Sequence, residues 1–261
     1  MDFRTVVDIP SLGFEIQPCE EILFVGSCFA DSIGQRFREE GFPVTVNPYG
    51  TMYNPASVLH TIERCGAAPR IVFITLGTNH VYWLKETGEI VDNCQKRPAA
   101  LFQEEELSVE ACADYLSKAV EMLKGRNPQV HVVFTVSPVR YRKYGYHESQ
   151  LSKATLLLAV DRLKAAYFPA YEIFMDELRD YRFYAPDMLH PSQQAVDYIW
   201  ERLVESCFSA EAKDFLKAWQ PLKQALNHKP FDPEAAAYKA LMDKTMLKVA
   251  ELREKYPTFA L

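Results

Sequence analysis

Two segments far apart in the chain carry the residue types that nucleophilic catalysis uses, and the first of them contains Ser27. It follows a short apolar run and Gly26, where an amphipathic helix is expected to begin. A hydroxyl at such a strand-to-helix turn lies beside the N–H groups and the positive dipole end of the helix, which can stabilise a developing oxyanion. A Gly-Ser pair is also common as an ordinary turn with a helix cap. The serine therefore needs a base elsewhere in the chain.

Asp187 and His190 have the spacing that such a base requires. The aspartate stands three residues before the histidine, and Pro191 and Ser192 then indicate the start of a helix. On one turn the carboxylate can hold the imidazole tautomer while the second ring nitrogen takes the proton of Ser27. A lone histidine before a helix can equally be structural or solvated. A Ser-His-Asp site is predicted if the fold brings the two segments together.

Length and composition indicate a globular protein without a nucleic-acid or membrane partner. The chain has 261 residues, 48% of them hydrophobic and 25% charged, which suits one sizeable α/β domain with appendages. Its net charge is −6 and it has no long basic run. Because neither a signal peptide nor a membrane-length apolar run is visible, we expect a cytoplasmic protein. Its six cysteines form no C-x-x-C pair, so free thiols are favoured over disulfides or a zinc site.

Alternating strand and helix signals place the candidate residues at one edge of a parallel sheet. Apolar runs predict strands at 21–25, 42–46, 70–76 and 130–136 and near 173–175, with a hairpin over 81–94. Helical spacing predicts helices over 30–40, 55–64, 108–124, 149–166 and 191–208. This order indicates an α/β fold with helices on both faces of the sheet. Ser27, the loop 47–54 and residues 77–79 and 137–138 then follow carboxyl ends of strands, where such sheets bind ligands.

The last part of the chain has a different character. Residues 209–261 contain no strand signal and predict two helices, over 210–226 and 233–256, joined through prolines. We therefore assign 1–208 to the α/β domain and 209–261 to a C-terminal helical extension, which either packs on the domain or serves as a homo-oligomer arm.

Several segments together resemble the GSCFA-domain family, a branch of the SGNH/GDSL-like hydrolases. The first is residues 26–30, whose letters are GSCFA. The resemblance covers roughly residues 18–208 and is specific in order and spacing. Its other segments are 47–55 (NPYGTMYNP), 75–78 (TLGT), 135–140 (TVSPVR), 150–154 (QLSKA) and 187–192 (DMLHPS).

The resemblance implies a flavodoxin-like three-layer α/β/α fold and an esterase-type site. Ser27 matches the nucleophile, and His190 and Asp187 match the base and the acid that orients it. The oxyanion hole would be formed by the N–H groups of Ser27 and Gly50 and by the side-chain amide of Asn79, in the block that begins at Gly77. No metal or organic cofactor is implied, because the acyl intermediate rests on the serine alone.

Four further side chains near these segments have functional and structural interpretations. His80 can line the substrate pocket or simply be structural. Arg140 can contact a sugar or a carboxylate of the substrate, or belong to a solvated loop. Cys28 is interpreted as a small buried hydrophobe, and Lys153 is expected to pair with an acidic neighbour.

The sequence thus predicts a serine esterase that cleaves an acyl ester on a saccharide or a cell-envelope glycan. The same site could transfer the acyl group to a hydroxyl acceptor instead of water. A non-catalytic glycan-binding module on the same fold and a structural protein that assembles through its helical tail are the competing classes. Hydrolysis of a simple ester by the wild type and by Ser27→Ala separates these classes.

Overall fold

Five parallel strands form the central sheet of the computed structural model, which describes residues 4–92, 94 and 97–261. The strand order is β2-β1-β3-β7-β8, the flavodoxin-like order, and every pairing is parallel. The strands are β1 (Ile22–Gly26), β2 (Val44–Val46), β3 (Ile71–Leu76), β7 (His131–Val136) and β8 (Ala166–Tyr167). The chain reverses direction across the sheet between β1 and β3, so the ends of these two strands flank the place where ligands bind in such folds.

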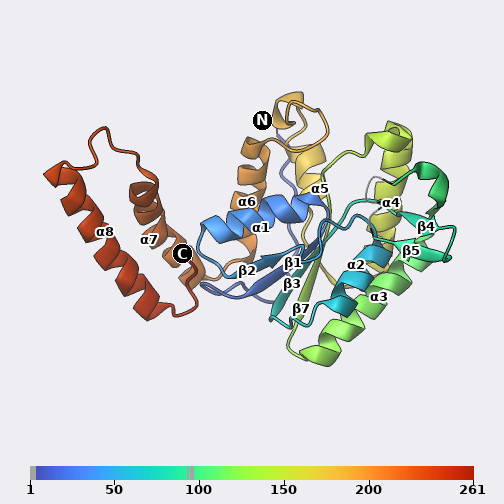
Figure 1. Ribbon diagram of the computed structural model, residues 1–261, viewed down its shortest axis with the longest axis horizontal. Helices are drawn as coiled ribbons and strands as arrows, with labels where there is room; N and C mark the ends of the chain where they lie inside the picture. Colours follow the sequence, from blue (N-terminus) through green and yellow to red (C-terminus); the bar gives the residue numbers. More distant parts are fainter. Residues whose placement is uncertain (1–3, 93, 95–96) are drawn as a thin grey trace.

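Alternate residues of β1 point into two different cores, as a strand with a period of two requires. Ile22 and Phe24 belong to one cluster of buried side chains, and Leu23 and Val25 belong to the other. Figure 1 shows helices on both faces of the sheet, which confirms the three-layer α/β/α prediction. The first cluster is covered by α1 (Cys28–Glu39), α5 (Ala170–Glu172) and α6 (Gln193–Cys207), and the second by α2 (Pro55–Arg64), α3 (Val109–Arg126) and α4 (Tyr146–Leu163).

Most of the helices begin at a residue whose side chain accepts a hydrogen bond from the first turn. Ser27 starts α1, Asn54 starts α2 and Ser192 starts α6 in this way. Pro55 then occupies the first turn of α2, where its missing N–H costs nothing. These caps explain why the predicted helices agree with the structure to within a few residues at their N-termini.

A second, antiparallel sheet lies beside the carboxyl end of β3. It contains β4 (His80–Leu84), β5 (Glu89–Val91) and β6 (Phe102–Glu106) in the order β5-β4-β6. The predicted hairpin over 81–94 is confirmed for β4 and β5, whereas its residue 93 lies outside the described residues. The strand β6 was not predicted, because its sequence FQEEE is polar and mostly exposed.

The prediction of a fifth strand near 173–175 is wrong. The fifth strand is β8, and residues 173–175 belong to the π-helical turn η3 (Ile173–Glu177) that continues α5. Both Ile173 and Phe174 are buried. A short apolar run is buried equally well by a strand and by a helical turn, so its hydrophobicity alone could not distinguish them. Short 3-10 turns complete the elements at η1 (Ala99–Leu101), η2 (Arg142–Tyr144) and η4 (Tyr181–Phe183).

The C-terminal segment forms α7 (Ala210–Asn227) and α8 (Ala236–Lys255), as predicted. Figure 1 shows both helices at the side of the molecule away from β4 and β5. Phe215 packs edge-on against Phe42, with ring centroids 6.1 Å apart, and so joins the core cluster of α1. The fully buried carboxylate of Glu40 accepts hydrogen bonds from Gln220 and Lys223 of α7 at 2.7 and 3.0 Å. Apolar contact and a buried ion pair therefore hold α7 on the end of α1. No helix among the described residues is long and apolar enough to cross a bilayer.

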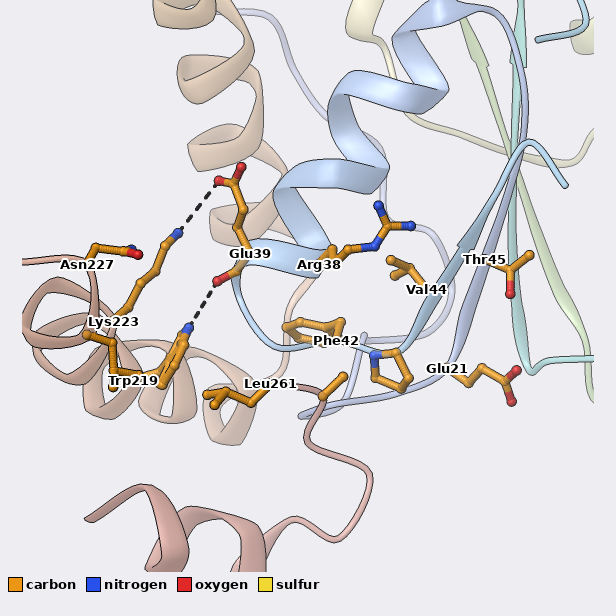
Figure 2. Close-up of a pocket in the computed structure, with 13 residues that line it drawn as sticks. Glu21, Arg38, Glu39, Phe42, Val44, Thr45, Trp219, Lys223, Asn227 and Leu261 are labelled. Carbon is orange, nitrogen blue, oxygen red and sulfur yellow. Dashed lines mark hydrogen bonds and ion pairs between the residues drawn. The ribbon is translucent and has the colours of Figure 1, made fainter. Parts of the chain in front are cut away.

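A cavity of about 670 Å³ lies where α7 meets the start of β2. Figure 2 shows Trp219 and Lys223 of α7 directed toward Glu39, with the Trp219 indole donating to the Glu39 carbonyl at 3.2 Å. Glu21, which precedes β1, also lines this cavity. Ser27 stands six residues further along, about 20 Å away at the rise of an extended strand. The cavity therefore lies at the amino edge of the sheet, opposite the candidate catalytic residues.

Candidate active site

Ser27 lies at the junction of β1 and α1, where its backbone leaves the sheet. Its side chain accepts from the Phe29 amide at 3.3 Å and caps the helix. The preceding Gly26 has φ +138°, and a Cβ at this position would lie 2.0 Å from the Thr75 carbonyl oxygen. Only glycine fits so close an approach of two backbones. The turn that presents Ser27 thus depends on the absence of a side chain at position 26.

Thr75 of β3 is the main partner of Ser27. The two hydroxyl oxygens are 3.0 Å apart, and the Ser27 amide donates to the Thr75 carbonyl at 2.9 Å. Thr75 was not singled out from the sequence, although it lies in a segment of the family resemblance. Its role follows from the register of the sheet, which pairs Gly26 with Thr75.

Asp187 and His190 form a hydrogen-bonded pair on the loop before α6. Asp187 Oδ2 lies 2.6 Å from His190 Nδ1, and Asp187 Oδ1 accepts from the amides of Leu189 and His190 at 2.9 and 3.0 Å. Met188 adopts φ +59° to close this turn. The hydrogen bonds from the backbone N–H groups of His190 and Leu189 lower the pKa of Asp187 to about 2, and the hydrogen bond with the His190 imidazole adds to this effect. The carboxylate therefore stays charged at neutral pH and can orient the imidazole.

Ser27 and the Asp187–His190 pair lie at the same edge of the sheet without a hydrogen bond between them. The loop of His190 is held by a bond of 3.0 Å from the Arg140 amide, just after β7, to the Leu189 carbonyl. Among the described residues His190 Nε2 has no hydrogen-bond partner, while Ser27 Oγ is bonded to Thr75 and Phe29. Transfer of a proton from Ser27 to His190 thus requires the serine side chain to leave Thr75. The catalytic assignment of the three residues stays a prediction.

The three expected oxyanion donors all have acceptors inside the protein. The Ser27 amide donates to Thr75, the Gly50 amide to the Asn47 carbonyl at 2.8 Å, and Asn79 Nδ2 to the Leu107 carbonyl at 2.8 Å. Each would have to share or exchange its acceptor to bind an oxyanion, so their roles also stay predictions. In the part of the chain that the structure describes, the Cys28 amide at the start of α1 has no acceptor. This N–H is a free donor next to the serine.

A network from the loop 47–54 holds the back of the Ser27 turn. The Gly26 amide donates to Asn47 Oδ1 at 2.8 Å, and Asn47 Nδ2 donates to Asp31 of α1 at 2.8 Å. The second oxygen of Asp31 accepts from the Thr51 hydroxyl at 3.1 Å. Local sequence patterns do not reveal Asp31, because its partners lie 16 and 20 residues away in the chain. This network joins the segment NPYGT to the segment GSCFA.

Two adjacent residues of α4 hold the loop that follows β3. The hydroxyl of Ser152 accepts from the Asn79 amide and is bonded to Thr78 Oγ1, both at 3.0 Å. Lys153 is buried, and its ammonium donates to the Gly77 carbonyl at 2.7 Å. The expected pairing of Lys153 with an acidic neighbour is wrong, since no carboxylate of the described residues forms an ion pair with it. Burial lowers the pKa of Lys153 to about 7.

His80 and Arg140, the two expected substrate contacts, line different cavities. His80 is buried, stacks on Tyr144 with ring centroids 3.7 Å apart, and lines a cavity of about 460 Å³ together with Tyr53 and Thr78. Burial lowers the pKa of His80, although Glu106 and Glu104 oppose this effect. Arg140 stacks on Tyr184 at 3.9 Å and lines a cavity of about 340 Å³. The first cavity adjoins the loop after β3, and the second adjoins the segment before the His190 loop. The predicted contacts of His80 and Arg140 with substrate stay predictions.

The cysteines are all free thiols in the described structure, and four of the six are buried. Cys28 differs from the expectation of a buried hydrophobe, because it is partly exposed. Its thiol pKa is nevertheless raised, mainly by burial and then by the charge of Asp31. A raised pKa disfavours the thiolate, so Cys28 is a poor rival to Ser27 as the nucleophile.

Comparison with protein families gives one match that covers most of the chain. A family model described as GSCFA family matches residues 21–70 and 67–203, and a model described as GSCFA domain protein, C-terminal domain, matches residues 219–261. No curated protein matches the chain.

Solved structures with a similar fold include several lipolytic and carbohydrate-active proteins. An acetyl-xylooligosaccharide esterase from Geobacillus is 15% identical, with 76% of this chain and 98% of that chain covered and a TM-score of 0.48. A Clostridium thermocellum family 3 carbohydrate esterase is 14% identical, with 78% and 98% covered and a TM-score of 0.42. A member of the lipolytic G-D-S-L family from Veillonella parvula is 13% identical, with 73% and 97% covered and a TM-score of 0.44.

Proposed function

Because the chain belongs to the GSCFA family, we propose that it is a serine esterase in which Ser27 is the nucleophile and His190 the base. The observation that carries the proposal is the bond of 2.6 Å between Asp187 and His190, at the same sheet edge as Ser27. This bond uses Nδ1 of the imidazole and leaves Nε2 to face a hydroxyl. A charged carboxylate that fixes one tautomer is what a general base needs.

The proposed reaction begins when the Ser27 hydroxyl turns from Thr75 toward His190. Nε2 takes the hydroxyl proton as Oγ forms a bond to the acyl carbon, and the carbonyl electron pair moves to the oxygen. Asp187 stabilises the imidazolium. The tetrahedral intermediate then expels the alcohol, which takes the proton from His190, and water repeats the sequence on the acyl-serine.

Negative charge on the intermediate needs hydrogen-bond donors at the start of α1. We propose that the free Cys28 amide is one of them, in addition to the Ser27 and Gly50 amides and the Asn79 side chain expected from the sequence. The N-terminus of α1 adds its positive dipole end at the same place.

We further propose that the alcohol part of the ester is a saccharide. The cavity of about 460 Å³ beside the loop 77–79 has the size of a small-ligand site, and it combines aromatic with charged side chains. Tyr53, Tyr82 and Tyr141 offer ring faces, while Glu104 and Lys143 offer hydrogen-bond partners for hydroxyl groups. Such a lining suits a polar ring better than a long acyl chain.

Hydrolysis of p-nitrophenyl acetate tests the reaction. We expect the wild type to hydrolyse this ester and Ser27→Ala to lose at least about 10³-fold in kcat. Ser32→Ala, on the exposed side of the same helix, is the matched control and should keep wild-type activity. Labelling of Ser27 by a fluorophosphonate extends the test to an enzyme that rejects small acetates. Equal rates in the wild type and Ser27→Ala, together with no labelling, would favour the glycan-binding module instead.

A further inference from the structure

Lys153 is a buried cation for which the described residues provide no buried anion. The residue is 3% exposed, and its one hydrogen bond within the described structure goes from the ammonium to the Gly77 carbonyl at 2.7 Å. Taking an ammonium out of water costs several kcal/mol unless a counter-charge compensates it. A methionine, whose side chain is almost as long, would avoid this cost. A charged side chain in the core without a counter-charge is destabilising, and such residues are expected mainly at functional sites.

The hydrogen bond of Lys153 ends on the residue that packs directly against the nucleophile. A Cβ placed on Gly77 would lie 3.4 Å from Ser27 Cβ and 3.1 Å from the Tyr53 carbonyl oxygen. The Gly77 amide in turn donates to that Tyr53 carbonyl at 2.8 Å. The ammonium therefore reaches the wall of the Ser27 site through a single backbone carbonyl.

Electrostatics also relate Lys153 to the start of α1. Burial and then the charge of Asp31 raise the pKa of the Cys28 thiol, and the positive charge of Lys153 opposes this rise. Cys28 stands next to Ser27 at the start of α1. The hydrogen bond to Gly77 and this effect on Cys28 both relate Lys153 to the residues that surround Ser27.

We propose that Lys153 is a positioning residue for the Ser27 site, which fixes the Gly77 backbone against Ser27 and supplies a positive charge behind the developing oxyanion. The inference rests on the proposed esterase function. Unlike the oxyanion donors, Lys153 acts through Gly77 and through space, so it need not touch the substrate. Water does not screen a charge that is fixed inside a protein. Such a charge close to the reacting groups therefore has a large effect on a charged transition state.

Lys153→Met is the variant that separates this role from a purely structural one. It keeps the length of the side chain and removes both the charge and the donor. We expect kcat for p-nitrophenyl acetate to fall about 10–100-fold with KM within threefold, since the lost interaction acts mainly in the transition state. Resistance to urea should not fall, because a buried charge is removed. Leu151→Ala, an exposed position on the same helix, should leave the kinetics unchanged.

The dependence of the reaction on pH gives the second readout. Burial lowers the pKa of Lys153 to about 7, so the ammonium is lost as pH rises through neutrality. We expect the rate at which a fluorophosphonate labels wild-type Ser27 to decline on the alkaline side of about pH 7, and this decline to be absent in Lys153→Met. Cys28→Ala should retain it, which excludes the neighbouring thiol as its source. The midpoint should agree with the titration of the Lys153 side-chain resonance in NMR spectra of the wild type.

Lys153→Gln separates the hydrogen bond to Gly77 from the positive charge. Hydrogen exchange tests the hold on the Gly77 backbone without an activity assay. The glutamine keeps a donor but not the charge, so its kcat should lie between those of the wild type and Lys153→Met. In Lys153→Met the Gly77 and Thr78 amides, which donate to Tyr53, should exchange faster than in the wild type. If Lys153→Met does not fold, the kcat of Lys153→Gln and the pH dependence of wild-type labelling decide whether Lys153 has the proposed role.

The proposal is overturned if Lys153→Met keeps wild-type kcat, pH profile and amide exchange. It is also overturned if kcat and stability fall together, which is the behaviour of a structural residue. Absence of both esterase activity and Ser27 labelling in the wild type would instead defeat the proposed function. In that case the exchange of the Gly77 and Thr78 amides still decides whether Lys153 holds this loop.

Discussion

The Ser27 hydroxyl lies 3.0 Å from the Thr75 hydroxyl of the neighbouring strand, and no hydrogen bond joins it to His190. This bond competes with the bond to His190 that nucleophilic attack requires. We therefore expect Thr75→Val, which keeps the shape of the side chain, to free the Ser27 hydroxyl. A neutral hydrogen bond contributes about 1 kcal/mol, so the rate of fluorophosphonate labelling should rise up to about fivefold.

A fall in the labelling rate of Thr75→Val would contradict this expectation. It would mean that Thr75 orients Ser27 for attack and does not compete with His190. Thermal unfolding of the variant controls for damage to the sheet, because Thr75 is buried.

The Asp187 carboxylate should be essential for kcat, but its titration should not appear in the pH dependence of the rate. Its pKa of about 2 keeps it charged at every pH at which the protein is assayed. Asp187→Asn keeps the size of the group but removes the charge that fixes the imidazole, so we expect kcat to fall about 10²–10⁴-fold. Asp180→Asn, which removes an exposed ion pair with Arg182, is the control. Similar activities of the two variants would remove Asp187 from the mechanism.

Gly26 should tolerate no side chain. The Cβ of Gly26→Ala would lie 2.0 Å from the Thr75 carbonyl oxygen at a positive φ, so one of the two strands must move. We expect a loss of roughly 3 kcal/mol or more in the free energy of unfolding, measured with urea. Gly88→Ala, at φ +66° in open space, carries only the conformational cost of about 1 kcal/mol. Equal losses in the two variants would show that the contact with Thr75 relaxes easily.

Asn79 has a structural partner that competes with its expected role as an oxyanion donor. Its amide nitrogen donates to the Leu107 carbonyl at 2.8 Å, and both groups lie in the protein interior. Asn79→Ala leaves this carbonyl without a donor, so we expect the free energy of unfolding to fall by about 1–3 kcal/mol. If Asn79 also acts as the proposed oxyanion donor, kcat falls about 10²–10³-fold in addition to this loss of stability. Urea unfolding and ester hydrolysis, measured on the same preparation, separate the two roles.

The buried ammonium of Lys153 should make stability depend on pH in a defined window. Its pKa is about 7 in the folded protein and near 10.4 in an unfolded chain. Between these values only the unfolded chain holds the proton, so the stability of the wild type rises with pH across the window. Below pH 7 both states are protonated and the full cost of burial, on the order of 5 kcal/mol, is present.

Lys153→Met should therefore be more stable than the wild type at pH 6, and the difference should shrink as the pH approaches 10. Urea unfolding at a series of pH values measures it. A difference that is constant with pH would mean that Lys153 is not desolvated in the folded protein.

Much of the fold could be predicted from local signals in the sequence. The apolar runs 70–76 and 130–136 are long enough to be buried strands, and capping residues such as Asn54 and Ser192 mark where helices begin. The two wrong predictions of strands have physical reasons. Strand β6 is a polar edge strand that pairs with β4 alone among the described strands. Residues 173–175 are apolar and form a helical turn. In both cases the chain's tertiary packing overrides its local pattern.

The sequence by itself determined which side chains could perform the chemistry and the turn that carries each of them. The Gly-Ser turn and the Asp-x-x-His spacing act over a few residues, and the Asp187–His190 bond forms as that spacing predicts. Only the tertiary structure decided their partners. The contact of Ser27 with Thr75, of Gly26 with Asn47 and of Lys153 with Gly77 each joins residues between 21 and 76 positions apart. Such contacts depend on the register of parallel strands and on the helix that crosses behind them, and neither is encoded in the residues that meet.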